Sequence, residues 1–203
     1  MIYLAPKNTP KSIKHFGLLI SLNSQREVRK PIWGMDNGRF GKNGVNEKWD
    51  ECEWIGMLRS YQNIPGCALC TVPDVPYDAT ATIIAFYQYL PIVQAYGYPV
   101  AIVTQNGMIP RDIPWNYIDA VFIGGDDNHK LGQEAIDILV AAKQNEKWTH
   151  VGRVNSAKRI KQFWYVDSVD GTTLAIEDSI KNIHRIQTAV DYCQAKKQTR
   201  RLL

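Results

Sequence analysis

Eight short apolar segments, separated by polar or helix-like stretches, dominate the pattern of this 203-residue chain. In chain order they read IYLAP, GLLIS, IWGMD, CALCTV, VAIVTQ, AVFIGG, THVGRV and DSVDG. Short apolar runs of this kind are typical of strands that are buried on both faces, as in a parallel sheet. The pattern therefore predicts a sheet of eight strands.

Helix-like stretches follow several of these segments. Residues 47–62, 78–97 and 131–146 carry apolar side chains at spacings of three and four, and residues 156–165 begin with Ser156, a preferred N-cap. Strand–helix alternation favours a parallel sheet covered by helices, and eight strands favour a compact, minimal α/β barrel of the (β/α)8 TIM type. A doubly wound open sheet is the alternative, but neither glycine-rich nucleotide fingerprint is present.

The chain contains no internal repeat, low-complexity tract or linker, so we expect one barrel domain over residues 1–203. A basic helix or tail is expected from about residue 176. No leader pattern and no apolar run of the ~18 residues that a membrane span needs is found. We therefore expect a cytoplasmic protein with no membrane partner.

Four cysteines are too few to form a disulfide framework in a chain of this length. Cys67 and Cys70 form a single CxxC without a second cysteine or histidine pair, and the simpler interpretation is two small residues in a buried strand. We expect no metal and no cofactor.

The net charge of +4 is unevenly distributed. Residues 181–203 contain six Lys and Arg against one acid, Asp191, and residues 7–30 contain six against Glu27. Basic ends indicate either a polyanionic partner or solvated helix faces, and the sequence leaves both open.

Polar residues or glycines follow six of the apolar segments. In a barrel of this type the active site lies at the C-terminal ends of the strands, so these residues are expected to meet in one pocket. The candidates are Asp36, Asn37, Asp74, Gln105, Gly124, Gly125, Arg153 and Asp170.

Single candidates also have simpler explanations. Residues 36–38 read Asp-Asn-Gly, a common turn, and Asp126 and Asp127 fit the start of a helix. His150 fits a hydrogen-bonded core histidine. The clustering of polar residues after successive strands is what indicates a site.

Six of these motifs, WGMDNGRF, VPDV, VTQNG, FIGGDDNHKLG, HVGRVNS and DSVDGT, resemble those of the tRNA-guanine transglycosylase superfamily in order and spacing. The likeness covers about residues 33–175 and is greatest to the phage and bacterial branch that inserts 7-deazaguanines into DNA. Two departures from the family pattern occur. Asp126, rather than an apolar residue, follows the glycine pair, and only His184 and Cys193 remain after Asp170 to supply the family's zinc subdomain, which is therefore expected to be absent.

The resemblance implies roles for the candidate residues. Asp170 takes the place of the nucleophile and Asp36 that of a general acid and base. Asp74 takes the place of the acid that reads the purine N1 and 2-amino hydrogens, while Gln105 and the Gly125 N–H face O6. The expected substrate-binding set is Asp74, Gln105, Gly124, Gly125, Asn37 and Arg153.

The function that the resemblance implies is a pentosyltransferase that replaces guanine in DNA with a 7-deazaguanine of the 7-cyano type. The reaction passes through a covalent aspartyl–sugar intermediate. The expected partners are DNA and the free 7-deazaguanine base, with an accessory protein left open, and the location is the host cytoplasm if the gene is a phage gene. Nucleic-acid contacts are expected from Lys158, Arg159, Lys196, Lys197, Arg200 and Arg201.

Several alternatives to DNA base exchange stay open. The chain could act on guanine in tRNA, hydrolyse a deazaguanine nucleoside, or bind nucleic acid without catalysis. A sugar-phosphate barrel enzyme is a further alternative, because Gly124 and Gly125 could hold a phosphate.

The last segment contains two aspartates, Asp167 and Asp170. An odd number of positions separates them, so on a strand they face opposite sides and only one can enter the pocket. The match to the family and the following Gly171 favour Asp170, which leaves Asp167 a structural role.

Overall fold

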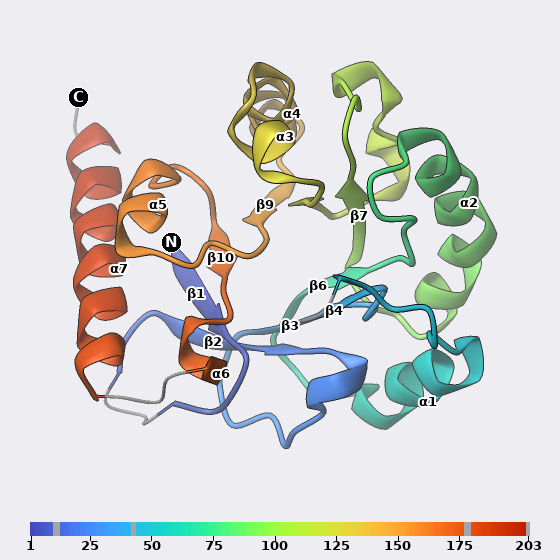
Figure 1. The fold of residues 1–203 in the computed structure, drawn as a ribbon, viewed down its shortest axis with the longest axis horizontal. Coiled ribbons are helices and arrows are strands. Elements are labelled where there is room, and N and C mark those ends of the chain that lie inside the picture. The colour runs from blue at the N-terminus through green and yellow to red at the C-terminus, as the bar shows by residue number, and fades with distance from the viewer. Residues whose placement is uncertain (10–12, 42–43, 177–179, 202–203) are drawn as a thin grey trace.

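The protein folds into a closed barrel of eight parallel strands surrounded by helices (Figure 1). This computed structural model describes residues 1–9, 13–41, 44–176 and 180–201. Around the barrel the strands follow the order β1-β10-β9-β8-β7-β6-β3-β2. The predicted (β/α)8-type fold is confirmed.

Each of the eight apolar segments overlaps one barrel strand. The strands are β1 (Ile2–Ala5), β2 (Phe16–Ile20), β3 (Trp33–Met35), β6 (Cys67–Thr71), β7 (Val100–Thr104), β8 (Ala120–Ile123), β9 (Trp148–Val151) and β10 (Ser168–Asp170). A short antiparallel hairpin, β4 (Phe40–Gly41) and β5 (Gly44–Val45), follows β3 and was not predicted.

The helices are α1 (Glu51–Tyr61), α2 (Ala79–Ala95), α3 (Asp127–Leu131), α4 (Gln133–Gln144), α5 (Ala157–Gln162), α6 (Thr173–Ile176) and α7 (Ile180–Arg201). The spacing of apolar residues correctly predicts α1, α2 and α4, whereas it does not reveal α3 and α6. Side-chain caps begin several of them: Asp50, Asp78, Asp126 and Ser156 each accept a hydrogen bond from a backbone N–H of the first turn. The predicted cap at Ser156 and the helix start at Asp126 are therefore confirmed.

Short connections explain how a complete barrel fits into this chain. In the described part of the chain, no α-helix lies between β1 and β2 or between β2 and β3, where only the 3-10 turn η1 (Leu22–Ser24) occurs. Two further 3-10 turns, η2 (Pro110–Asp112) and η3 (Trp115–Tyr117), connect β7 to β8. The first α-helix, α1, lies between β3 and β6, and its Tyr61 packs against Trp33 of β3.

Two apolar layers hold the barrel together. The larger layer lies between strands and helices and includes Trp33, Trp54 and Phe86, all at most 1% exposed. The smaller layer fills the barrel interior and consists of Leu4, Leu19, Leu69, Ala101, Val103, Ala120 and Phe122. Interior side chains thus plug the middle of the barrel.

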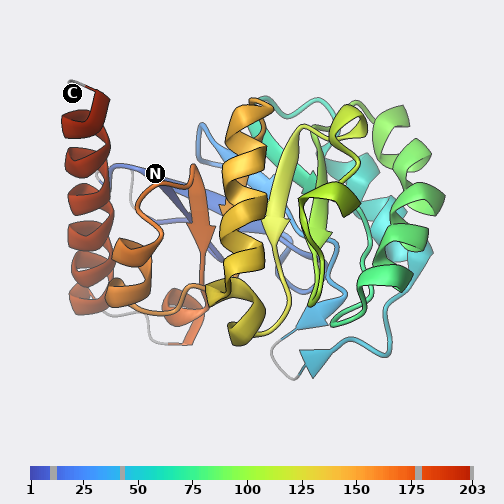
Figure 2. The same cartoon turned by 90° about the horizontal axis from the view of Figure 1, so that it is seen from above.

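None of the helices in the described residues is long and apolar enough to cross a membrane. The longest, α7, packs against α5 on the outside of the barrel. Figure 2 shows α7 beside the strands, with its C-terminal end at the edge opposite to that toward which the strand arrows point.

The turn before β6 depends on a glycine, which gives a test of the fold. Gly66 has φ +87°, and a Cβ added there would lie 2.0 Å from the Pro31 carbonyl oxygen. We expect Gly66→Ala to lower the free energy of unfolding by more than about 2 kcal/mol, measured by urea denaturation.

Gly56→Ala is the matched control. Gly56 lies inside α1, where an added Cβ meets no atom within 4 Å, so alanine should raise the free energy of unfolding by about 0.5–1 kcal/mol. Equal stability of the two variants would contradict the backbone geometry at Gly66.

Candidate active site

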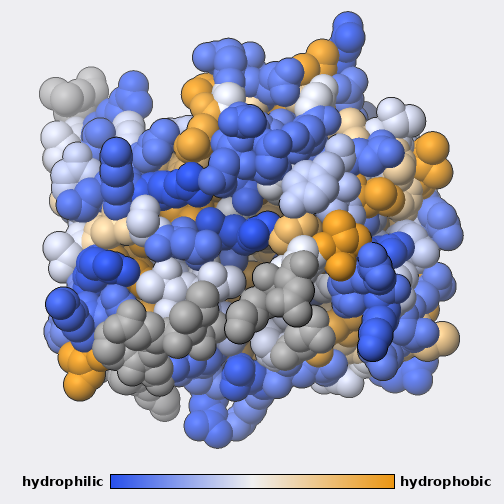
Figure 3. All heavy atoms as spheres, viewed as in Figure 1, coloured by the Kyte–Doolittle hydropathy of each residue, from blue (hydrophilic) through white to orange (hydrophobic). Residues whose placement is uncertain are grey.

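A cavity of about 270 Å³ opens at the carboxyl ends of the strands. Every barrel strand, or the residues that follow it, contributes to the lining: Leu4, Leu19, Asp36, Asp74, Val103, Phe122, Gly152 and Asp170 each come from a different strand or the loop after it. The face that carries these ends is mostly hydrophilic (Figure 3). The volume of the cavity is near the lower end of the range for small-molecule sites.

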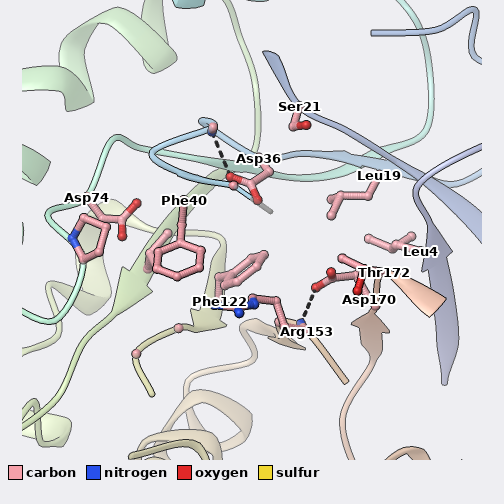
Figure 4. A pocket seen from close by; sticks show the side chains of 18 of the residues that line it. Leu4, Leu19, Ser21, Asp36, Phe40, Asp74, Phe122, Arg153, Asp170 and Thr172 are labelled. Atoms are coloured by element: carbon pink, nitrogen blue, oxygen red, sulfur yellow. Dashed lines mark hydrogen bonds between the residues drawn. The ribbon is translucent and has the colours of Figure 1, made fainter. Parts of the chain in front are cut away.

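Most of the predicted site residues meet in this cavity. Its lining includes Asp36, Asp74, Gln105, Gly124, Gly125, Arg153 and Asp170. Figure 4 shows the carboxylates of Asp36, Asp74 and Asp170 around one space, with Phe122 and Arg153 between Asp74 and Asp170. Asn37 is the one predicted substrate contact that does not line the cavity.

The carboxylate of Asp170 is held through one of its two oxygens. Oδ1 accepts hydrogen bonds from the Arg153 backbone N–H and from His150 Nε2, both at 3.0 Å. No described residue donates a hydrogen bond to Oδ2. The side chain is only 11% exposed, so Asp170 presents one oriented, unoccupied oxygen to the cavity.

A chain of hydrogen bonds fixes the tautomer of His150. The Trp148 indole N–H donates to Ser168 Oγ at 2.8 Å, and the same oxygen lies 2.8 Å from His150 Nδ1. A carboxylate oxygen can only accept, so the hydrogen between His150 and Asp170 lies on Nε2, and Ser168 Oγ, which accepts from Trp148, can donate its own hydrogen to Nδ1. His150 is therefore the hydrogen-bonded core histidine that the sequence predicts, but its partner is the candidate nucleophile.

Asp36 follows β3 and is the carboxyl group best placed to carry a proton. Burial, together with the smaller effect of the neighbouring charges of Asp74 and Asp170, raises the pKa of Asp36 to about 7 against the opposing hydrogen bond from the Gly38 N–H. Near neutral pH this carboxyl group can both donate and accept a proton, which suits a general acid and base.

Asp74 is buried and bonded through both oxygens. Asn37 Nδ2 donates to Oδ1 at 2.9 Å and Gln105 Nε2 donates to Oδ2 at 2.6 Å. Burial raises the pKa of Asp74 to about 6 in spite of these two bonds, so the group is ionised at neutral pH. Asn37, which also donates to the Val72 carbonyl, supports Asp74 from behind instead of contacting a ligand.

Gln105 and the glycine pair form the part of the wall beside Asp74. Gln105 Oε1 accepts from the Tyr77 N–H at 2.7 Å, which together with the bond to Asp74 fixes the orientation of the amide. A Cβ on Gly124 would lie 2.8 Å from the Thr104 carbonyl oxygen, and Gly125 has φ +68°. Only glycines fit at these positions, so bare backbone faces the cavity.

Aromatic rings line the cavity between the polar groups. Phe40, on β4, lies edge-on to Tyr77 at 5.8 Å, and the guanidinium of Arg153 lies over the Phe40 ring at 4.2 Å. Phe122 lies against His150 at 4.4 Å. Flat apolar walls of this kind suit a planar ring as ligand.

Asp167 lies outside the cavity, as the odd spacing from Asp170 predicts. Its carboxylate accepts hydrogen bonds from the Thr149 N–H and Oγ1, both at 2.9 Å, and from Lys143 Nζ. Burial raises its pKa, but the bonds from Lys143 and Thr149 outweigh this effect, and the net pKa lies below the ordinary value. Asp167 is thus a structural acid at the amino end of β10.

The six bases predicted to contact nucleic acid divide between the two ends of the barrel. Lys158 and Arg159 lie on α5, which follows the carboxyl end of β9, and Arg159 forms a two-bond ion pair with Asp127. Lys158 is exposed at the same end. These two bases therefore lie at the same end of the barrel as the cavity.

The bases at the end of α7 lie at the other end. Lys197 Nζ donates to the Val166 carbonyl oxygen and lies 3.9 Å from Asp167, directly before the start of β10. Lys196 and Arg200 lie over the Trp164 ring, at 4.5 and 5.4 Å. Because helices that follow parallel strands run back toward the amino ends, the expected tail contacts do not meet at the cavity. The side chain of Arg201 is outside the described part.

The CxxC cysteines lie in β6. Cys70 is fully buried, and burial raises the pKa of the Cys67 thiol to about 12. Among the residues that the structure describes, no group of three or more His, Cys, Asp or Glu side chains could hold a metal ion. The pair therefore fits the buried-strand interpretation.

Sequence reasoning missed three groups at the cavity: His150 as the partner of Asp170, Phe40, and Lys130. A signal for the first was present, because His150 and Ser168 are direct neighbours in the pairing of β9 with β10. Phe40 lies four residues after Asp36, on a hairpin that the apolar pattern does not reveal.

A scan against protein-family models matched no family, and a search of the curated proteins found no relative. The case for a function therefore depends on the cavity and the side chains within it.

The raised pKa of Asp36 predicts a specific effect of pH on stability. Between about pH 4 and pH 7 the folded protein holds a proton on Asp36 that the unfolded chain has lost, so stability falls as pH rises through this window. Asp36→Asn removes this fall. We expect the variant to gain stability relative to wild type from pH 4 to 7 and to keep that gain above pH 7, measured by urea denaturation.

Asp167→Asn serves as a control of opposite sign. Its lowered pKa means that the ionised group stabilises the fold above about pH 4 and that this stabilisation is lost in acid, so the variant should be less stable than wild type at pH 7. If the stability difference between Asp36→Asn and wild type does not change with pH, the pKa of Asp36 is not raised in the folded protein.

Proposed function

We propose that this barrel exchanges nucleobases, replacing guanine in DNA with a 7-deazaguanine of the 7-cyano type through a covalent intermediate on Asp170. One observation carries the proposal: a carboxylate with one held and one unoccupied oxygen shares a cavity with a second carboxyl group that carries a proton near neutral pH. This is the pairing that a retaining glycosyl transfer requires.

In the first half of the reaction, Asp170 Oδ2 attacks C1′ of the nucleotide as the bond to the guanine nitrogen breaks. Asp36 gives its proton to the leaving base, and the electron pair of the broken bond stays with that base. The hydrogen bonds from His150 and Arg153 to Oδ1 aim the attacking oxygen. The products are an aspartyl–sugar ester and free guanine.

In the second half, the incoming 7-deazaguanine takes the place of guanine. Asp36, now ionised, removes the hydrogen from the ring nitrogen that attacks C1′, and the ester bond to Asp170 breaks. Two attacks from opposite faces of the sugar retain its configuration. Asp36 ends protonated and Asp170 ends ionised, as both began.

Selection of a guanine-like base falls to Asp74 and Gln105. An ionised Asp74 accepts the N1 and 2-amino hydrogens of guanine, which adenine does not offer at those positions. The second Nε2 hydrogen of Gln105 and the Gly125 N–H can be donated to O6. The rings of Phe40 and Phe122 supply the apolar walls for a planar base.

A base inside a duplex cannot reach the end of this barrel, so DNA must present it flipped or single-stranded. The assay that tests the proposal measures release of labelled guanine from DNA and from tRNA, with and without a 7-deazaguanine. Acceptor-dependent release from DNA supports the proposal. Release only from tRNA indicates a tRNA enzyme, and release without acceptor indicates a hydrolase.

Substitution of the two aspartates of the last segment tests the chemistry. Asp170→Asn should abolish base exchange, by at least about a thousandfold, because the amide cannot attack C1′. The base pocket of Asp74 and Gln105 should still bind the free deazaguanine, measured by calorimetry. A covalent protein–DNA adduct, trapped by denaturing wild type before acceptor is added, should be missing in this variant.

Asp167→Asn is the matched control, with the same chemical change three residues away. Because Asp167 faces Thr149 and Lys143, this variant should keep substantial exchange activity at a temperature where it is folded. An essential Asp167 beside a dispensable Asp170 would overturn the assignment of the nucleophile.

The two groups of bases give a test of the DNA-binding face. Lys158→Ala with Arg159→Ala should weaken DNA binding and reduce the slope of log K against log salt by roughly 0.9 for each phosphate that the variant no longer binds. Lys196→Ala with Arg200→Ala should leave that slope unchanged, because these side chains lie over Trp164 at the other end of the barrel. A slope that responds only to the second pair would place DNA away from the cavity.

A further inference from the structure

A second hollow, of about 390 Å³, adjoins the active-site cavity. The two spaces share four lining residues, Tyr77, Gly125, Lys130 and Arg153. The remaining walls of the second hollow come from Asp126, Asp127, Asn155 and Arg159. It therefore lies on the side of the cavity formed by the loops after β8 and β9.

Lys130 lies at the boundary between the two spaces. It is only 6% exposed, although it lines both of them. Within the described residues, no acceptor forms a hydrogen bond with its ammonium group and no carboxylate forms an ion pair with it. Burial and the nearby charge of Arg153 lower the pKa of Lys130 to about 8, so the side chain is still mainly a cation at neutral pH. The charges of Asp170 and Asp127 attract this cation without a direct bond to it, and a bound anion would supply the hydrogen-bonding partner that the buried ammonium group lacks.

The other charged groups around the hollow leave it with a positive excess. The guanidinium of Arg153 lies over Phe40 and forms no ion pair with the described carboxylates. Arg159 and Asp127 neutralise each other in their ion pair, and Asp126 is the N-cap of α3, where it accepts from the His129 N–H. Lys130 and Arg153 are thus the cations available to a ligand, against the single charge of Asp126.

Arg153 also connects this hollow with Asp170. Its backbone N–H donates to Asp170 Oδ1, while its side chain lines both spaces. A group bound by the Arg153 side chain therefore lies next to the sugar that Asp170 attacks. In a nucleotide, the group attached to that sugar is a phosphate.

We propose that the second hollow binds the phosphate attached to the sugar of the reacting nucleotide, with Lys130 and Arg153 donating to its oxygens. The substrate class is therefore a phosphorylated nucleotide or a nucleotide unit of a chain, and not a free nucleoside. The identity of the sugar that lies beside Asp170 rests on the proposed base exchange, but the anion site does not depend on it.

The test compares ligands that differ only in phosphate. Calorimetry with wild type should show 2′-deoxyguanosine 5′-monophosphate binding at least about tenfold tighter than 2′-deoxyguanosine. Lys130→Met should remove this preference while leaving the affinity for deoxyguanosine unchanged. Lys147→Met, at the amino end of β9, is the matched control and should bind both ligands as wild type does. Equal binding of the two ligands by wild type, or a preference that survives Lys130→Met, overturns the proposal.

Inorganic phosphate separates this inference from the proposed function. It should bind wild type in competition with the monophosphate and should lose affinity at least about tenfold in Lys130→Met and, independently, in Arg153→Met. If both variants lose phosphate affinity but wild type exchanges no base, base exchange is refuted and the anion site is supported. If wild type exchanges bases but both variants bind phosphate as tightly as wild type does, the anion site is refuted and base exchange is supported.

A short single-stranded oligonucleotide containing one guanine distinguishes the two sources of phosphate. A Lys130-dependent affinity for the oligonucleotide assigns the site to the phosphodiester of a chain. If Lys130→Met weakens binding of the monophosphate but not of the oligonucleotide, the hollow binds a free nucleotide and DNA is excluded from it.

Discussion

Pairing of β1 with β10 closes the barrel, and the cavity exists only because of this closure. Leu4 pairs with Asp170 in this register, and the Tyr3 hydroxyl donates to the Gly171 carbonyl oxygen at 3.0 Å, across 168 positions of sequence. Without β1, β10 would be an edge strand, and Asp170 would lie at an exposed edge next to water. With it, the carboxyl ends of all eight strands form a ring, and short polar segments far apart in the chain face one another.

Within this ring, three carboxyl groups occupy one small cavity, and their surroundings give them different properties. Asp170 and Asp74 each accept two hydrogen bonds from fixed N–H donors. Asp36 has one such bond, from Gly38, and lies in the field of both other acids. Burial is the main cause of the raised pKa of Asp36, and the charges of the other two acids add to it, so this carboxyl group can hold a proton near neutral pH. All three residues are aspartates, so their different properties come from burial and hydrogen bonding and not from the residue type.

Most of the fold and much of the site could be predicted, because both depend on local periodicity. Parallel strands give apolar runs, and residues that follow them must meet at one end, which brings Asp36, Asp74 and Asp170 together. Partners across strands were harder to predict: His150 looks like any core residue until the register of β9 against β10 is known. Lys130 lies on α3, a helix of one short turn whose packing against the cavity no spacing reveals. The direction of α7, which carries the C-terminal bases away from the cavity, follows from topology once the closed barrel is accepted.

The bases of this chain show why charge counted along a sequence is a weak guide to a binding face. Lys197 donates to the Val166 carbonyl oxygen, and Lys196 lies over Trp164, so these cations already have partners in the protein and stabilise the attachment of α7 to the barrel. Lys130 and Arg153 belong to no basic run in the sequence, yet both line the cavity of Asp170 and the hollow that adjoins it. Recognition of an anion depends on where desolvated positive charge remains unpaired, and this is decided by packing rather than by composition.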